Sequence, residues 1–139
     1  MGFKGAMMAR VLIVDDTDIV RKALAAVVKR MGHQVRSASD GAAAWELTLQ
    51  EPPDLALLDL QMPGMDGAAL FKKLRAGLGD RCPKVVFVSA TPPEEVARRL
   101  RDVGEPDGHV TKPFHLDELM RVVGDVLSPG EDTEELKLA

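Results

Sequence analysis

The sequence predicts an α/β fold, an open parallel sheet of five strands with helices on both faces. Five apolar runs of strand length alternate with five stretches of helical periodicity along 139 residues. The run "KVVFVS" is apolar at nearly every position, as expected of a strand covered on both faces. Strands separated by helices lie parallel and are joined by right-handed crossovers. The length suits one compact domain.

The first half of the chain supplies two strand–helix units. Residues 10–14 form the first expected strand, and the helix after it ends at Gly32. The apolar stripe of that helix consists of Val20, Leu24, Val27, Val28 and Met31. A second strand covers residues 34–39. Asp40 can then cap a helix that ends at Gln50, ahead of two prolines.

The third and fourth units follow the same pattern. Residues 54–59 are expected to form the third strand, and Asp66 can cap the helix after it. The apolar positions of that helix are Leu70, Phe71 and Leu74. Residues 84–89 form the fourth expected strand. Pro93 suits the first turn of a helix expected over residues 94–103.

The fifth unit and the two ends of the chain set the expected domain boundaries. A strand over residues 108–112 precedes a last helix striped by Leu116, Leu119, Met120, Val123 and Leu127. We expect one domain over residues 10–127. Residues 1–9 are interpreted as a leader that is either disordered or added by cloning. Residues 128–139 are acidic and polar, which is typical of a tail or a linker stub.

Composition limits the classes of partner. The net charge of −4 argues against a general nucleic-acid binder and against attraction to an anionic membrane. Cys82 is the single cysteine, so an internal disulfide is excluded and the cytoplasm is the expected compartment. No apolar segment has the length needed to span a membrane.

Polar side chains follow four of the five expected strands. Asp15 and Asp16 follow the first strand, Asp59 ends the third, Ser89 ends the fourth and Lys112 ends the fifth. Ligands of open parallel sheets bind beyond the carboxyl ends of the strands, so these side chains are expected to lie together. Each of them alone has an ordinary structural explanation, such as a helix cap or a solvated charge. Their coincidence at one edge favours a functional site.

The chemistry of this set points to phosphoryl transfer. Three crowded carboxylates raise one another's pKa unless a cation neutralises them. Oxygen-only ligands favour a hard divalent ion, Mg²⁺ or Mn²⁺. With such an ion beside it, Asp59 can act as a nucleophile that forms an aspartyl phosphate. Lys112 and the Ser89 hydroxyl would then share the charge on the phosphoryl oxygens.

Four motifs in order, "LIVDD", "LLDLQMPGMDG", "VVFVSA" and "TKPF", resemble the receiver domains of two-component response regulators. This resemblance implies a flavodoxin-like (βα)5 fold with strand order 2-1-3-4-5. It implies that Asp59 accepts a phosphoryl group from a histidine kinase or a phosphotransfer protein. It also implies Mg²⁺ at Asp16, Asp59 and the carbonyl of Gln61, with Asp15 acting through water.

The resemblance assigns further roles around the expected site. It implies that Ser89 is the switching hydroxyl and that Lys112 binds phosphate, ahead of a cis bond to Pro113. Gln61 and Thr91 each lie two residues beyond a site residue, where side chains can reach the path of the attacking water. Neither is a carboxylate, so we expect them to tune dephosphorylation by admitting and orienting water.

His109 departs from the family pattern. Receiver domains usually carry Tyr or Phe three residues before the lysine, and the ring moves inward when the domain is phosphorylated. His109 is then either a polar residue at a strand edge or a replacement for the ring whose inward position depends on pH. The sequence leaves both interpretations open.

The resemblance also sets expectations for the whole molecule. We expect a signalling switch with slow autophosphatase activity rather than a metabolic enzyme. The expected partners are a kinase or phosphotransfer protein and an unknown output partner, with no direct contact to nucleic acid or membrane. The expected assembly is a monomer or a weak dimer. The chain is interpreted as a stand-alone receiver or a part cut from a larger regulator or hybrid kinase.

Two alternatives use the same residues differently. Asp16 and Asp18 fit the D-x-D-x-V motif of haloacid-dehalogenase-type phosphatases, with Asp16 as nucleophile and Asp18 as general acid–base. An apolar residue usually stands where Asp15 does in that family, and the fourth strand is followed by "VSATPP" where that family has an acidic pair. The other alternative is an interaction module that keeps the fold and does not use phosphate.

Overall fold

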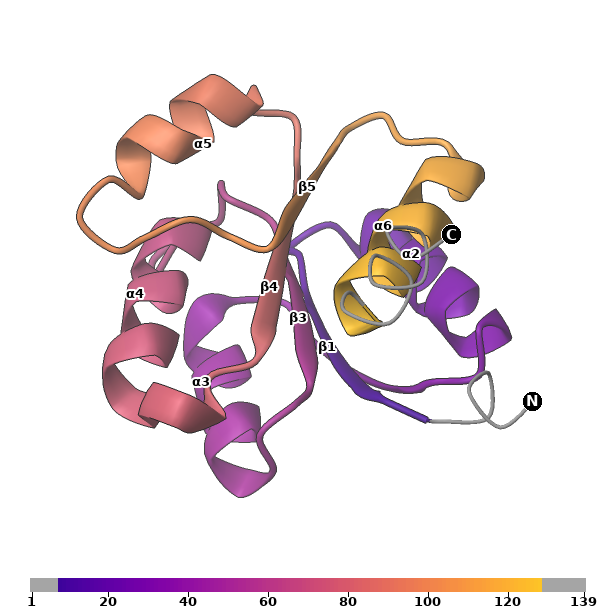
Figure 1. The fold of residues 1–139 in the computed structure, drawn as a ribbon, viewed down its shortest axis with the longest axis horizontal. Coiled ribbons are helices and arrows are strands. Elements are labelled where there is room, and N and C mark those ends of the chain that lie inside the picture. The colour runs from indigo at the N-terminus through magenta and orange to yellow at the C-terminus, as the bar shows by residue number, and fades with distance from the viewer. Residues whose placement is uncertain (1–7, 129–139) are drawn as a thin grey trace, which may run out of the picture.

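A computed structural model describes residues 8–128. Five parallel strands form one sheet in the order β2-β1-β3-β4-β5 (Figure 1). The strands are β1 (Arg10–Val14), β2 (Gln34–Ala38), β3 (Leu55–Leu58), β4 (Lys84–Ser89) and β5 (Gly108–Thr111). The predicted fold class and strand order are therefore confirmed, and the predicted strand bounds are right to within one residue at each end.

Helices cover both faces of the sheet. They are α2 (Asp18–Arg30), α3 (Gly41–Gln50), α4 (Gly67–Leu78), α5 (Pro93–Arg99) and α6 (Leu116–Leu127), with a short 3-10 helix, η1 (Gly79–Arg81). In Figure 1, α2 and α6 lie on one side of the sheet, and α3, α4 and α5 lie on the other. None of the helices within residues 8–128 combines the length and the apolar character needed to cross a membrane.

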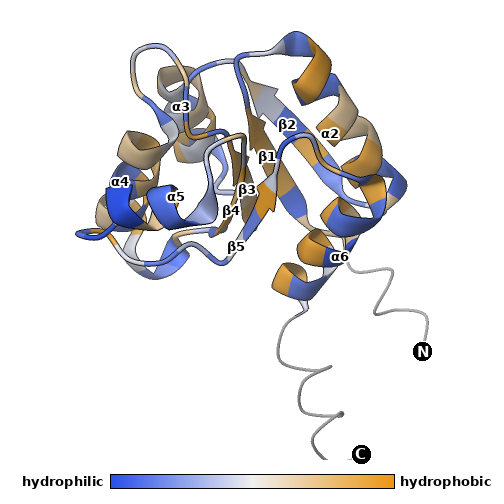
Figure 2. Cartoon of the chain, turned by 90° about the horizontal axis from the view of Figure 1, so that it is seen from above, coloured by the Kyte–Doolittle hydropathy of each residue, from blue (hydrophilic) through white to orange (hydrophobic). Residues whose placement is uncertain are grey.

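Each face of the sheet has its own hydrophobic core. Leu12 and Val14 of β1 pack under α3, α4 and α5, whereas Val11 and Ile13 pack under α2 and α6. Burial on both faces explains why the strands are almost entirely apolar. Figure 2 shows the same division, with hydrophobic strands between helices whose outer surfaces are mostly hydrophilic.

Strand pairing continues one residue beyond the carboxyl ends of three strands. The amide of Asp59 donates to the carbonyl of Val14 (3.0 Å), and the amide of Lys112 donates to the carbonyl of Ser89 (3.0 Å). The amide of Asp15 donates to the carbonyl of Ala38 at the end of β2 (3.2 Å). The polar residues that follow the strands are therefore fixed by the sheet itself.

Helix boundaries largely follow the predicted signals. Asp40 caps α3 and Asp66 caps α4, each through a bond from the amide three residues on. The prediction of a helix over residues 94–103 was wrong at its end, because α5 stops at Arg99. Hydrogen-bonded turns then lead to Gly104, whose φ of +128° is a backbone conformation that favours glycine.

The last helix differs from its predicted stripe. Leu119 and Val123 are buried as expected, but Leu116 and Met120 are 54% and 43% exposed. Val126 is buried instead. The inward face of α6 is therefore rotated relative to the stripe inferred from the sequence.

Candidate functional site

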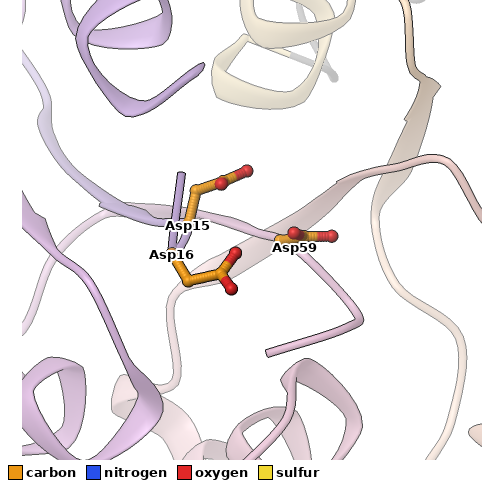
Figure 3. A group of neighbouring side chains, drawn as sticks. All are labelled: Asp15, Asp16 and Asp59. Atoms are coloured by element: carbon orange, nitrogen blue, oxygen red, sulfur yellow. The ribbon is translucent and has the colours of Figure 1, made fainter. Parts of the chain in front are cut away.

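Three carboxyl groups meet at the carboxyl edge of the sheet. Asp15 and Asp16 follow β1, and Asp59 follows the adjacent β3 (Figure 3). One oxygen from each of the three groups lies within 4.8 Å of the others. Asp15 and Asp59 are buried, while Asp16 is exposed to solvent. The structure thus brings together the three aspartates that the sequence placed at this edge.

Lys112 supplies a positive charge to this cluster. Its Nζ lies 2.8 Å from Oδ2 of Asp15 and 3.3 Å from Oδ2 of Asp59. Its side chain is only 19% exposed, so these ion pairs are shielded from much of the solvent. The bond between Lys112 and Pro113 is cis. One ammonium among three carboxylates leaves the cluster with an excess of negative charge.

The surroundings of the cluster shift the pKa of two of its groups, Asp59 and Lys112. Burial raises the pKa of Asp59, and the charge of Asp15 adds to this effect, while Lys112 opposes it. For Lys112, burial alone would lower the pKa, but the hydrogen bond to Asp15 and the charges of Asp59 and Asp15 outweigh burial and raise it. Asp59 is therefore a buried carboxylate that gains from any additional cation placed beside it.

The remaining predicted residues lie around this cluster. The hydroxyl of Ser89 is buried at the end of β4 and accepts a hydrogen bond from the amide of Thr91 (3.1 Å). Thr91 is itself buried, whereas Gln61 is exposed. The amide of Gln61 donates to Oδ1 of Asp59 (3.4 Å).

His109 lies on β5, in register with Phe87 of β4. Its Nε2 is buried and has no hydrogen-bond partner among the described residues, and its Nδ1 lies 3.5 Å from the hydroxyl of Thr111. Burial lowers the pKa of His109, against weaker opposing effects of the Thr91 backbone and of the charges on Glu118 and Glu94. A neutral ring suits this position because a buried charge without a partner is costly.

Gly67 is a site residue that the sequence interpretation missed. A Cβ at this position would lie 2.2 Å from the carbonyl oxygen of Asp59 and 2.9 Å from the Cα of Leu60. The amide of Gly67 also donates to the carbonyl of Leu60 (2.8 Å). The start of α4 therefore rests directly on the backbone of Asp59. A glycine directly after the capping Asp66 indicates a close approach, but the sequence does not specify which residue is approached.

Comparison with known proteins decides the family. The sequence profile described as the response regulator receiver domain matches residues 11–124. This chain belongs to the receiver domain family. The receiver is 32% identical over 117 residues to sporulation initiation phosphotransferase F of Bacillus subtilis, covering 84% of this chain and 92% of that protein.

Other relatives carry the same domain as part of a longer chain. The receiver is 36% identical over 114 residues to response regulator MprA of Mycobacterium tuberculosis, which is 82% of this chain but 48% of MprA. It therefore spans about half the length of that relative. Among solved structures, chemotaxis protein CheY4 of Vibrio cholerae superposes with a TM-score of 0.80 at 26% identity, over 87% of this chain and 100% of CheY4.

Membership in this family confirms the resemblance found in the sequence and the expectation of a two-component signalling switch. The receiver interpretation is therefore favoured over the haloacid-dehalogenase interpretation of Asp16 and Asp18. The oxygen-only donors at the site, with their excess of negative charge, fit the divalent cation expected of a receiver.

Proposed function

We propose that this receiver accepts a phosphoryl group on Asp59 from a histidine kinase or a phosphotransfer protein. The observation that supports this most strongly is the setting of Asp59, which is buried, next to Lys112 and within reach of two further carboxylates. Phosphorylation would change an output face, and slow autodephosphorylation would reset it. The output partner is unknown, and the domain works as a monomer or weak dimer in the cytoplasm without direct contact to nucleic acid or membrane.

Four residues would hold Mg²⁺ or Mn²⁺ at this site. Asp16, Asp59 and the carbonyl of Gln61 would bind it directly, and Asp15 would act through water. When bound, the ion stabilises negative charge on the phosphoryl oxygens. The close approach of the three carboxylates supports this assignment, because they repel one another without a cation.

The transfer step uses the side chains of this chain in defined roles. A carboxylate oxygen of Asp59 attacks the phosphorus of a phosphohistidine, an O–P bond forms, and the P–N bond breaks with its electron pair returning to the imidazole nitrogen. Lys112, already 3.3 Å from Asp59, moves to a phosphoryl oxygen. The Ser89 hydroxyl, which accepts from the Thr91 amide, turns to donate to another phosphoryl oxygen.

Hydrolysis resets the switch. A water molecule attacks the phosphorus, and the O–P bond to Asp59 breaks to give inorganic phosphate and the free carboxylate. The side chains of Gln61 and Thr91 tune this step by controlling where water enters. His109 replaces the usual aromatic ring and moves inward when Ser89 turns, more readily when its imidazole is neutral. Replacing both Gln61 and Thr91 with alanine should change the dephosphorylation rate, and an unchanged rate removes them from this role.

The test is direct phosphorylation. Incubation with acetyl phosphate and Mg²⁺ should add the mass of one phosphoryl group to the protein, as measured by intact-mass spectrometry. Asp59→Asn should abolish the added mass, and omission of Mg²⁺ should reduce it strongly. If the wild type gains no mass, the chain is an interaction module that does not use phosphate. If Asp59→Asn still gains mass, the acceptor has been misassigned.

A further inference from the structure

Arg21 lies on α2 and makes two contacts next to the cluster of aspartates. Its Nη1 donates to the backbone carbonyl of Asp15 (2.7 Å), and its Nη2 forms an ion pair with Asp18. The Arg21 side chain is only 17% exposed, whereas that of Asp18 is 73% exposed. The guanidinium therefore spans from the first turn of α2 back to the residue that follows β1.

The carbonyl that Arg21 binds belongs to the peptide between Asp15 and Asp16. The side chain of Asp15 is held independently, by Lys112 and by the amide of Thr17 (2.9 Å). Asp16 is exposed, and its carboxylate makes no hydrogen bond to any residue between 8 and 128. The direction of the Asp16 carboxylate toward Asp59 is therefore set by the backbone that carries it.

We infer that Arg21 is a positioning residue for the cation site, because its guanidinium fixes the peptide between Asp15 and Asp16. A planar fork can bridge a carbonyl and a carboxylate at once, which a lysine ammonium on its flexible stem cannot do in the same way. The inference rests on the proposed cation site and adds a residue that does not bind the ion. Groups that orient metal ligands commonly affect affinity about 10–100-fold.

The charge of Arg21 and its positioning contact predict opposite effects of its substitution on the affinity for the cation. A positive charge close to a cation site repels the ion, so its removal alone should tighten binding. Loss of a positioning contact should weaken binding, because Asp16 would no longer be held toward Asp59. Arg21→Lys keeps the charge and loses the bridge, while Arg21→Met loses both. The pair of variants therefore separates the two effects.

The experiment is a calorimetric titration of the full chain with Mn²⁺, without a phosphoryl donor, which measures the affinity for the ion. Both Arg21 variants should bind Mn²⁺ about tenfold more weakly than the wild type. The matched control is Lys22→Met, which removes an exposed charge from the neighbouring position of the same helix and should stay within about twofold. The amide resonances of Asp16 and Thr17 should shift in metal-free Arg21→Lys.

The outcomes are distinguishable. Wild-type affinity in Arg21→Lys, or tighter binding in Arg21→Met, overturns the positioning role. If the wild type itself binds no Mn²⁺, the proposed cation site fails before the inference is reached. If thermal melting shows that the Arg21 variants do not fold, Asp18→Asn provides the test, because it frees one end of the guanidinium. That variant should bind Mn²⁺ several-fold more weakly, and unchanged binding contradicts the inference.

Discussion

The two edges of the sheet hold their aspartates in different ways. At the amino edge, Asp54 exchanges two hydrogen bonds with Arg10: its amide donates to the Arg10 carbonyl (2.8 Å), and its carboxylate accepts from the Arg10 amide (2.8 Å). Asp107 forms the same pair of bonds with Val85, at 2.7 and 2.8 Å. At the carboxyl edge, Asp15 and Asp59 instead share the ammonium of Lys112.

This difference separates carboxylates that extend the strand ladder from those that we propose take part in phosphoryl transfer. A backbone amide satisfies a carboxylate permanently and joins two strands, so Asp54 and Asp107 act as extensions of the strand ladder. Asp59 receives only a 3.4 Å bond from an amide and lies in a cluster with too few cations. Its burial raises its pKa, and such shifts are common among groups at functional sites.

The largest effect on stability is expected from a substitution that places an added atom against the backbone of Asp59. Gly67→Ala places a Cβ against the carbonyl of Asp59, so the free energy of unfolding should fall by about 3 kcal/mol. Gly124→Ala is the control, since a Cβ there meets no atom within 4 Å and the helix should gain up to about 1 kcal/mol. Urea denaturation of both variants measures the difference. Equal changes would show that α4 does not press on Asp59.

Replacing one aspartate at each edge by asparagine should change stability in opposite directions. Without divalent cations at pH 7, Asp59→Asn should increase the free energy of unfolding by about 1 kcal/mol, because it removes a poorly compensated buried charge. Asp107→Asn should decrease it by about 1 kcal/mol, because a charge-assisted bond becomes a neutral one. Changes of the same sign would remove the distinction between the edges.

The same comparison predicts a pH dependence for Asp59. Its pKa is raised on folding, so the native state binds the proton more tightly than the unfolded chain. The contribution of Asp59 to wild-type stability should therefore fall as pH rises from about 3.8 through the raised pKa, and the advantage of Asp59→Asn should disappear at lower pH. Denaturation of both proteins between pH 3 and 7 tests this, and a constant difference would contradict it.

His33 gives the amino edge a weaker sensitivity to acid. Its Nδ1 accepts a hydrogen bond from the amide of Ala9 (3.1 Å), and burial lowers its pKa, against the charge of Asp54. A lowered histidine pKa means that the unfolded chain binds the proton first, so this stabilisation is present above pH 6.5 and is lost as pH falls below it. We expect a loss of under about 1 kcal/mol by pH 5.

His33→Gln should flatten this part of the pH profile. His115→Gln is the control, because His115 is an exposed histidine. Chemical denaturation between pH 5 and 8 supplies the measurement. If the wild type and His33→Gln lose stability in parallel, His33 does not anchor the start of β1.

The smallest effect is expected for the link between α5 and the loop of residues 59–66, which joins β3 to α4. Oδ1 of Asp66 caps α4 through Ala69, and Oδ2 accepts from Arg99 (2.7 Å). Asp66→Asn retains a capping oxygen and removes the charge, so a double-mutant cycle with Arg99→Gln isolates the ion pair. Because the two side chains are 29% and 38% exposed, the coupling should be about 0.5 kcal/mol. A coupling of zero would show that α5 is not tied to this loop.

Most of the fold could be predicted from the sequence because the patterns that define its strands and helices are local. The apolar run over residues 84–89 defines β4 at both ends, and Asp40 and Asp66 begin helices by capping their own first turns. The end of α5 was misplaced because the apolar spacing of Val96 and Leu100 continues into turns that also pack on the core. Periodicity reports which side chains are buried, not which amides are bonded.

The site was predictable only in part for a similar reason. Asp15, Asp59 and Lys112 could be placed together because parallel strands end at one edge. The bridge from Arg21 to the Asp15 carbonyl and the contact of Gly67 with Asp59 depend on where helices start relative to the strands. No spacing in the sequence specifies those distances. The cluster of charges was therefore inferred, while the residues that hold its backbone were found in the structure.

The ion pair between Lys112 and Asp15 joins residues 97 positions apart. Forming a contact of such separation costs the closure entropy of a long loop, which is paid before the contact stabilises the chain. During synthesis, β1 and β3 leave the ribosome well before Lys112 does. A nascent chain therefore carries its aspartates without their lysine. Under the proposed function, the acceptor site is therefore complete only after β5 and Lys112 have been synthesised.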